Sequence, residues 1–514
     1  MRSRFTLLLL FGLAFVLCRS GFAQGRGAPP PPPNDFFTYD YQAKEAEKIP
    51  DIPPVVTKHQ MSVAGQTISY TATVGFMPIR NVSTGVVEGH IWYAYYKKDA
   101  VTDPATRPIF FLFNGGPGSS TIWLEFGAFG PKIVKLLPDG TSPPPPYSYV
   151  DNPSTLLDGA DMVFFNPVGT GFSRPARPDW GPKFWGFSND IASSAEFIRS
   201  FLGEYDRWGS PRYVGGESYG TTRAAGLAGY LTSHDIPLNG VALISTYISS
   251  NAAAGDLASM GSVPTWIMTA WYLKKLSPDL QKLTAEQMAE QARQFASGEY
   301  LQALYQGDRV TQVQHQKVLD DLSRLTGLSK AFLEANNLRF DLGRWSTELM
   351  RDQSLMVGRL DTRFTAYNMD AGGITVSTDA SEANIRLSFL SAYEQYLRHD
   401  LNCINNSLYY VLGGGIGPWT DQAPPPGAVA MLEDALVRNP HMHVYVAEGY
   451  YNYSWYNTEY WIHHLRAPAN VRVHNIHLDE FESGHMMYID QKANARLRAG
   501  MLNLIKVSLQ APAP

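Results

Sequence analysis

The chain has 514 residues, of which 44% are hydrophobic, and a formal net charge of -5 at pH 7. This length exceeds the size at which a single core usually stops growing, so we expect one large domain with a sizeable insertion. The weakly acidic balance, together with a sequence that has no lysine- and arginine-rich run, argues against a nucleic-acid partner.

Residues 1–23 have the pattern of a secretory signal peptide. Arginines precede an apolar run from Phe5 to Leu17, and Gly21 and Ala23 are spaced as a cleavage site requires. This run is short for a membrane span, and no apolar segment of about 20 residues follows. We therefore expect an exported protein, periplasmic or extracellular, without a membrane span. A lipoprotein anchor at Cys18 is disfavoured, because the bulky Leu17 precedes that cysteine.

Residues 24–50 contain a run of prolines, which favours an extended spacer. The next segments, residues 58–79 and 88–99, alternate polar and apolar side chains as antiparallel strands do. Once the signal is removed, Cys403 is the remaining cysteine, so the mature chain cannot form an internal disulfide.

Several short segments are almost continuously apolar, as strands buried on both faces are. Helix-like segments, residues 189–205 and 220–234, lie between them. The pattern predicts an α/β fold with a mostly parallel sheet flanked by helices. The predicted buried strands are residues 108–113, 161–166, the segment before Ser218, 240–245 and 443–449.

Residues 251–422 have helical spacing and many helix-forming residues, without buried-strand runs. We expect a helical cap inserted into the sheet domain. The two parts of the sheet domain are then residues 51–250 and 423–514.

Ser218 lies in the sequence Gly-Glu-Ser-Tyr-Gly, between a predicted strand and a predicted helix. This is the nucleophile-elbow pattern, in which a sharp turn lifts the serine hydroxyl out of the sheet. An ordinary glycine turn is the alternative interpretation of the pentapeptide. The strand before it and the helix after it favour the elbow.

Two other segments complete a candidate site. The sequence FNGGPGSS, residues 113–120, follows a buried strand, and its glycines let backbone N–H groups approach a ligand as an oxyanion hole requires. The chain order of this fold class calls for a late histidine, and His485 fits. His474 and His477 are predicted to lie in one strand and to point to opposite faces, so we expect no shared metal site there. Serine hydrolase chemistry also calls for no metal or organic cofactor.

Four ordered segments, NGGPGSS, NPVGTGFSRP, GGESYG and SGHM, resemble the serine carboxypeptidase family, whose members have an α/β-hydrolase fold with an inserted helical cap. The resemblance spans residues 58–514. It implies that Ser218 is the nucleophile and His485 the general base, and that the substrate is a peptide cut at its C-terminus. An acyl-enzyme forms and water releases it.

The same resemblance implies the roles of the surrounding groups. The backbone N–H groups of Gly116 and Tyr219 would form the oxyanion hole. Asn114 and Glu217 would bind the terminal carboxylate of the substrate.

The position of the triad aspartate is a departure from the family, because Asn452 stands there. An amide accepts a hydrogen bond from imidazole but does not stabilise imidazolium by charge. In a well-studied serine protease this exchange lowers turnover by about 10⁴-fold. Glu448 and Glu459 are alternative acids.

A second departure is Ala128, at a position where the family has a glutamate that pairs with the one beside the nucleophile. Without that partner we expect Glu217 to ionise more readily and to repel a substrate carboxylate. Glu125 replaces the missing partner only if the loop takes a different course.

These features lead to one main hypothesis, an exported serine carboxypeptidase-like hydrolase. An esterase or acyltransferase on the same scaffold is an alternative. Asn452 and Ala128 also leave open a catalytically weakened homologue that binds peptides.

Overall fold

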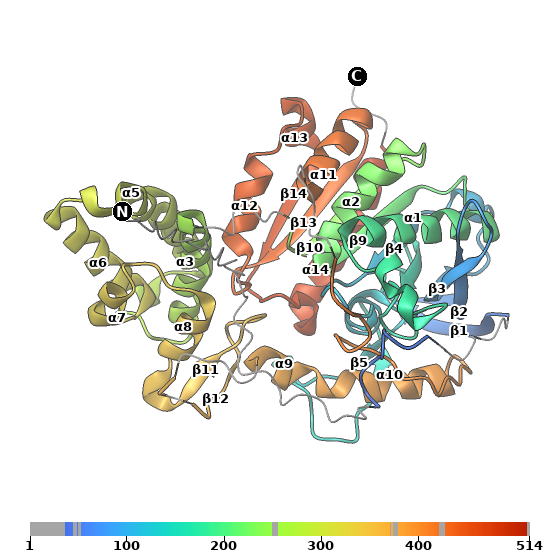
Figure 1. Cartoon of the computed structure of the whole chain (residues 1–514), viewed down its shortest axis with the longest axis horizontal. Coiled ribbons are helices and arrows are strands. Elements are labelled where there is room, and N and C mark those ends of the chain that lie inside the picture. The colour runs from blue at the N-terminus through green and yellow to red at the C-terminus, as the bar shows by residue number, and fades with distance from the viewer. Residues whose placement is uncertain are drawn as a thin grey trace, which may run out of the picture.

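A ten-stranded sheet forms the centre of the computed structural model, which describes residues 36–44, 49, 53–248, 255–370, 372–373, 379–420 and 427–510. The strand order is β1-β2-β3-β7-β4-β9-β10-β13-β14, with β8 paired to β3. Strand pairs from β7 to β14 are parallel, and those from β1 to β7 are antiparallel. The expected α/β fold with a mostly parallel sheet between helices is confirmed (Figure 1). The predicted signal, residues 1–23, lies outside the described residues, as does most of the predicted spacer.

Every residue of the central strands β4, β7 and β10 is buried, as helices on both faces require. The strands of the sheet are β1 (Val55–Val63), β2 (Gln66–Arg80), β3 (Val87–Lys98), β4 (Ile109–Phe113), β7 (Asp161–Phe165), β8 (Arg174–Pro175), β9 (Arg212–Ser218), β10 (Gly240–Thr246), β13 (His443–Gly449) and β14 (Ile476–Phe481). Two short hairpins lie outside it, β5 (Lys132–Val134) with β6 (Tyr149–Asp151), and β11 (Leu355–Val357) with β12 (Thr365–Tyr367).

Alternate residues of each strand enter two different cores. Phe110 and Leu112 of β4 belong to the core on the face covered by α14 (Gln491–Ser508). Phe111 and Phe113 belong to the core on the opposite face. That face is covered by α1 (Phe187–Glu204), α2 (Tyr219–Ser233) and α11 (Gly427–Arg438). The period of two along a strand thus divides a continuous apolar run between two helical layers.

The first part of the chain between β10 and β13 forms a largely helical region beside the sheet, which Figure 1 shows on the left. Helices α3 to α8 share a core of their own that includes Trp266 and Trp345. Their bounds are α3 (Gly255–Tyr272), α4 (Ala285–Phe295), α5 (Leu301–Gln306), α6 (Gln312–Thr326), α7 (Lys330–Ala335) and α8 (Leu342–Glu348). The cap boundaries at residues 251 and 422 remain predictions, because both positions lie outside the described residues.

Helices α9 (Ala380–Ile385) and α10 (Leu387–His399) belong to the predicted cap by sequence but pack elsewhere. Phe389 and Tyr393 of α10 are buried in a core of the sheet domain.

A second deviation concerns residues 472–475, predicted as strand. They end helix α13 (Ala469–Asn475), and the Asn475 amide bonds to two carbonyls before β13. In the described part of the chain no helix is long and apolar enough to cross a membrane.

Candidate active site

Ser218 ends β9, and Tyr219 begins α2 directly after it. The serine backbone has φ 60° and ψ -129°, an uncommon conformation for a residue with a side chain. A Cβ on Gly216 would lie 2.1 Å from the carbonyl oxygen of Gly220, so the strand and helix can approach this closely only with glycine there. The close approach at Gly216 lets the turn hold Ser218 at the carboxyl end of the central strand β9.

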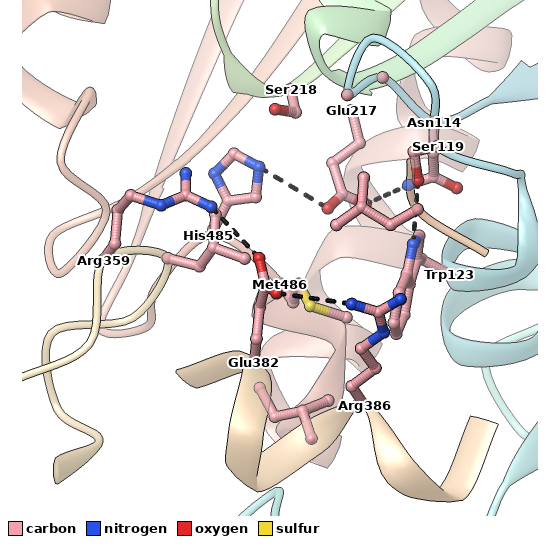
Figure 2. Close-up of a pocket in the computed structure, with 15 residues that line it drawn as sticks. Asn114, Ser119, Trp123, Glu217, Ser218, Arg359, Glu382, Arg386, His485 and Met486 are labelled. Atoms are coloured by element: carbon pink, nitrogen blue, oxygen red, sulfur yellow. Dashed lines mark hydrogen bonds and ion pairs between the residues drawn. The ribbon is translucent and has the colours of Figure 1, made fainter. Parts of the chain in front are cut away.

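Ser218 and His485 line one cavity, which holds about 650 Å³ when its open mouth is included. Figure 2 shows Ser218 above the imidazole of His485 and Glu217 to the right of the ring. His485 follows β14, and its backbone is held by two long-range hydrogen bonds. Its N–H donates to Leu360 O over 2.8 Å, and its carbonyl accepts from Ser245 Oγ over 2.5 Å. No hydrogen bond between Ser218 Oγ and His485 occurs among the described residues, although catalytic contacts often tighten only with substrate bound.

Asn452 lies 3.0 Å from His485, measured from Oδ1 to Nδ1. Its Nδ2 donates to Glu448 Oε1 and, over 2.8 Å, to Ser454 Oγ. Both amide hydrogens are therefore used, and Oδ1 faces the imidazole as an acceptor. Nδ1 of His485 must then carry the ring proton, which leaves Nε2 as the basic nitrogen.

The imidazole of His485 is almost fully buried, and this burial lowers its pKa to about 3, with a smaller contribution from the positive charge of Arg359. A low pKa keeps the ring neutral and its Nε2 unprotonated across moderate pH. The ring of Tyr453 stacks near it, with centroids 6.5 Å apart.

Of the two candidate oxyanion-hole residues, Tyr219 begins α2 and Gly116 lies in the glycine turn after β4. Gly116 lines the cavity, and the neighbouring Gly115 is so close to the helix that a Cβ there would be 2.4 Å from the backbone nitrogen of Tyr219. The glycine turn after β4 thus packs directly on the elbow. Gly116 lines the same cavity as Ser218, and Tyr219 follows Ser218 directly in the chain.

Asn114 and Glu217 meet in the same cavity. Oε2 of Glu217 accepts from Asn114 Nδ2 over 2.9 Å and from the Tyr488 hydroxyl over 2.7 Å. Oε1 lies 3.9 Å from His485 Nε2. Burial raises the pKa of Glu217 to about 8, although both hydrogen bonds act against the rise. Burial therefore keeps Glu217 from ionising readily even without a carboxyl partner, against the expectation of a charged group that repels a substrate carboxylate.

Glu125 does not take the place of the missing family glutamate. It lies in a π-helical turn, η2 (Leu124–Phe129), and accepts hydrogen bonds from Tyr96 and Tyr393 over 2.8 and 2.9 Å. Burial among these phenols raises its pKa to about 7. Tyr488, three residues after His485, contacts Glu217 instead, a partner that no motif in the sequence indicated.

The outer wall of the cavity carries charged groups that the sequence did not reveal. Arg359 pairs with Glu382 over 3.3 Å, and Arg386 pairs with the same carboxylate over 3.8 Å. Trp123 and Met486 form apolar parts of the wall (Figure 2). Arg359, Glu382 and Arg386 belong to no motif, so only the fold brings them to the site.

Two further acids lie near the site. Asp190, in the first turn of α1, makes a buried ion pair with Arg223 over 2.9 Å, and Arg223 donates to the Asn114 carbonyl over 2.6 Å, which braces the glycine turn. Glu459 pairs with Arg293 over 2.7 Å and makes no hydrogen bond to His485 within the described residues. His474 lies in α13, not in a strand with His477.

The described residues contain no group of three or more His, Cys, Asp or Glu side chains placed to hold a metal ion.

Comparison with known proteins identifies the family. The serine carboxypeptidase family model matches residues 64–351. Serine carboxypeptidase-like 38 of Arabidopsis thaliana is 31% identical over 134 residues, which are 24% of this chain and 25% of that protein. Carboxypeptidase Y of Saccharomyces cerevisiae is 27% identical over 149 residues, which are 28% of this chain and 25% of that protein. These alignments span about a quarter of each curated relative.

Among solved structures, Kex1(delta)p, a prohormone-processing carboxypeptidase from Saccharomyces cerevisiae, is similar with a TM-score of 0.51 and 12% identity. The match covers 85% of this chain and 91% of that one, and it shows a common fold. The family model covers more than half of the sequence and includes the glycine turn and the elbow. The chain therefore belongs to the serine carboxypeptidase family.

Proposed function

We propose that the protein is a serine-type carboxypeptidase that releases the C-terminal amino acid of peptides. The observation that carries this proposal is the shared cavity of Ser218, a neutral His485 with an unprotonated Nε2, and the buried Glu217 carboxyl. A nucleophile, a base and a group suited to a terminal carboxylate are the parts that exopeptidase chemistry needs.

In the proposed reaction, Ser218 Oγ attacks the last peptide carbonyl while its proton passes to His485 Nε2. Backbone N–H groups of Gly116 and Tyr219 stabilise the oxyanion. His485 then gives the proton to the leaving amine, the C–N bond breaks, and the acyl group remains on Ser218. Water attacks this ester with His485 again as base, which restores the serine hydroxyl.

Specificity for a free C-terminus would come from Glu217 and Asn114. Oε2 of Glu217 already accepts two hydrogen bonds, so its proton belongs on Oε1, on the side of His485. Because its pKa is raised to about 8, Glu217 is neutral at moderate pH and can donate this proton in a hydrogen bond to the substrate carboxylate.

The test compares three N-blocked substrates: a dipeptide with a free carboxylate, its C-terminal amide, and an amino-acid ester. We expect cleavage of the free dipeptide and loss of that cleavage in Ser218→Ala. Equal cleavage of the amide would refute the exopeptidase assignment. Cleavage of the ester alone would favour the esterase or acyltransferase. Absence of all turnover would leave a weakened peptide-binding homologue.

We also propose that the protein is exported after removal of residues 1–23 and that the proline run that follows forms a spacer. The predicted spacer of residues 24–50 is too long, because Tyr39 and Tyr41 already pack against a core of the sheet domain. N-terminal sequencing of the exported protein is expected to begin at Gln24. Retention of the apolar run in the mature protein would contradict this.

A further inference from the structure

Glu448 is a fully buried carboxyl group that the proposed reaction does not use. It is the last residue but one of β13, directly before Gly449, and its Oε1 accepts a hydrogen bond from the Nδ2 of Asn452. Asn452 in turn contacts His485. A continuous chain of hydrogen bonds therefore runs from a buried acid through an amide to the candidate base.

The surroundings of Glu448 suit a group that only accepts hydrogen bonds. Oε2 accepts from the Thr246 backbone N–H over 2.9 Å and from Thr458 Oγ1 over 2.7 Å. Oε1 accepts from Gly449 N over 3.3 Å as well as from Asn452. A carboxylate satisfies all these donors, whereas a glutamine would turn an NH₂ group toward at least one of them.

The orientation of the Asn452 amide decides the state of His485. If the amide were flipped, Nδ2 would face Nδ1 of the imidazole, and the ring proton would move to Nε2. A histidine in that tautomer cannot take a proton from Ser218, which is how an Asp-to-Asn exchange disables the triad of a well-studied protease. Glu448 and Ser454 hold both amide hydrogens away from the imidazole and so oppose the flip.

We propose that Glu448 is a positioning residue that takes over the function of the missing triad aspartate. It acts through Asn452, which lies between Glu448 and His485 in the hydrogen-bond chain. It fixes Asn452 so that Oδ1 accepts from the Nδ1–H of His485. Burial raises the pKa of Glu448 to about 7, so above that pH its negative charge also polarises the amide toward the imidazolium that forms during the reaction. The inference rests on the proposed function, in which Ser218 is the nucleophile and His485 the base.

The first test is Glu448→Gln. Losing a hydrogen bond to a charged group predicts a fall in kcat of about ten- to a hundredfold, with KM nearly unchanged, because no substrate contact is altered. Glu125→Gln is the matched control, since Glu125 is equally buried, has a pKa also raised to about 7, and lies outside the site. An equal kcat in both variants would overturn the proposal, as would a change confined to KM.

The second test is a double-mutant cycle with Asn452→Asp. In the double variant E448Q/N452D the glutamine amide donates to the aspartate, and the aspartate accepts from His485. The hydrogen-bond chain is restored, and the carboxylate now stands at position 452 in place of position 448. We expect N452D to raise kcat by about tenfold or more in the E448Q background and by clearly less in the wild-type background. Equal effects in both backgrounds would mean that the two residues act independently, against the proposal.

A spectroscopic readout separates this inference from the proposed function. ¹⁵N NMR of the His485 imidazole, assigned by difference against His485→Gln, is expected to report a protonated Nδ1 in wild type and in E125Q. A second tautomer is expected in E448Q. If wild type shows this NMR pattern but is inactive, the carboxypeptidase proposal is refuted and the positioning role of Glu448 is supported. If wild type is active and E448Q has the same tautomer, the positioning role is refuted and the carboxypeptidase proposal stands.

Discussion

The two halves of the candidate site are built in different ways. The serine half, residues 216–220 with Gly115 and Gly116, is a strand-turn-helix unit packed on a glycine turn, and it depends on backbones that approach closely. The histidine half consists of His485, Asn452 and Glu448. It depends on polar side chains and on contacts from elsewhere, such as Thr265 of α3, which donates to the Asn452 carbonyl over 2.9 Å.

This difference explains which half tolerates exchange. A side chain on a contact glycine collides with backbone, and backbone cannot move without separating strand from helix. A hydrogen-bond chain can keep its direction when an acid and an amide change places, provided that every donor still finds an acceptor. One of the two departures from the family pattern accordingly lies at Asn452, the other being Ala128, while the glycines of the elbow match the family pattern.

The strongest test of the comparison asks whether the two halves act as one unit. Ser218→Ala is expected to lower kcat by about 10⁴-fold or more, because no other nucleophile is placed at the elbow. His485→Ala should cost a similar amount, and the double variant no more than either single change. Single-turnover hydrolysis of the blocked dipeptide measures this. A double variant whose losses multiply would show that the halves act separately.

Gly216→Ala breaks the serine half by steric means. The new methyl would lie 2.1 Å from the Gly220 carbonyl oxygen, so we expect a loss of about 1–3 kcal/mol in the free energy of unfolding, with reduced kcat. Gly203→Ala is the control, because the nearest atom to its Cβ would be 3.8 Å away. Urea unfolding of the two variants measures the difference. Equal stability would contradict the close-approach argument.

The pH dependence of substrate binding sharpens the role of Glu217, which lies between the two halves. Its pKa is raised to about 8, so the carboxyl is neutral below that pH and becomes charged above it. KM for a free-carboxylate substrate should therefore rise as the pH passes through 8, and KM for a neutral ester should not. The Tyr488 hydrogen bond lowers this pKa, so Tyr488→Phe should move the rise to higher pH. An equal pH response of both substrates would exclude Glu217 as the carboxylate site.

Arg359→Gln is expected to have the smallest effect, and it concerns the histidine half alone. The positive charge of Arg359 contributes to the low pKa of His485, although burial contributes more. Its removal should raise the His485 pKa, so kcat/KM should begin to fall at a higher pH on the acidic side. A profile identical to wild type would show that the guanidinium is screened from the imidazole.

Much of the serine half could be predicted from sequence, because each of its requirements is local. Continuous apolar runs mark the buried strands, and the spacing of glycines around Ser218 marks the turn. The same reasoning placed the mostly parallel sheet and its flanking helices. It failed at residues 472–475, where contacts of Asn475 with the chain before β13 accompany a helix in place of the expected strand.

The histidine half could be predicted only in part, because the partners of its side chains come from distant segments of the chain. Sequence named His485 and Asn452 through order and resemblance, and it left Glu448 and Glu459 as equal alternatives. Only the tertiary structure decided that Glu448 bonds to Asn452 while Glu459 pairs with Arg293. It also decided that Glu217 is protonated at moderate pH, since a pKa follows from burial and hydrogen-bond partners supplied by distant segments. The sequence by itself determined the candidate nucleophile, base and carboxylate-binding groups, because motifs and chain order mark them. The packing of sheet, loops and cap determined their charge, orientation and partners, and added groups such as Tyr488.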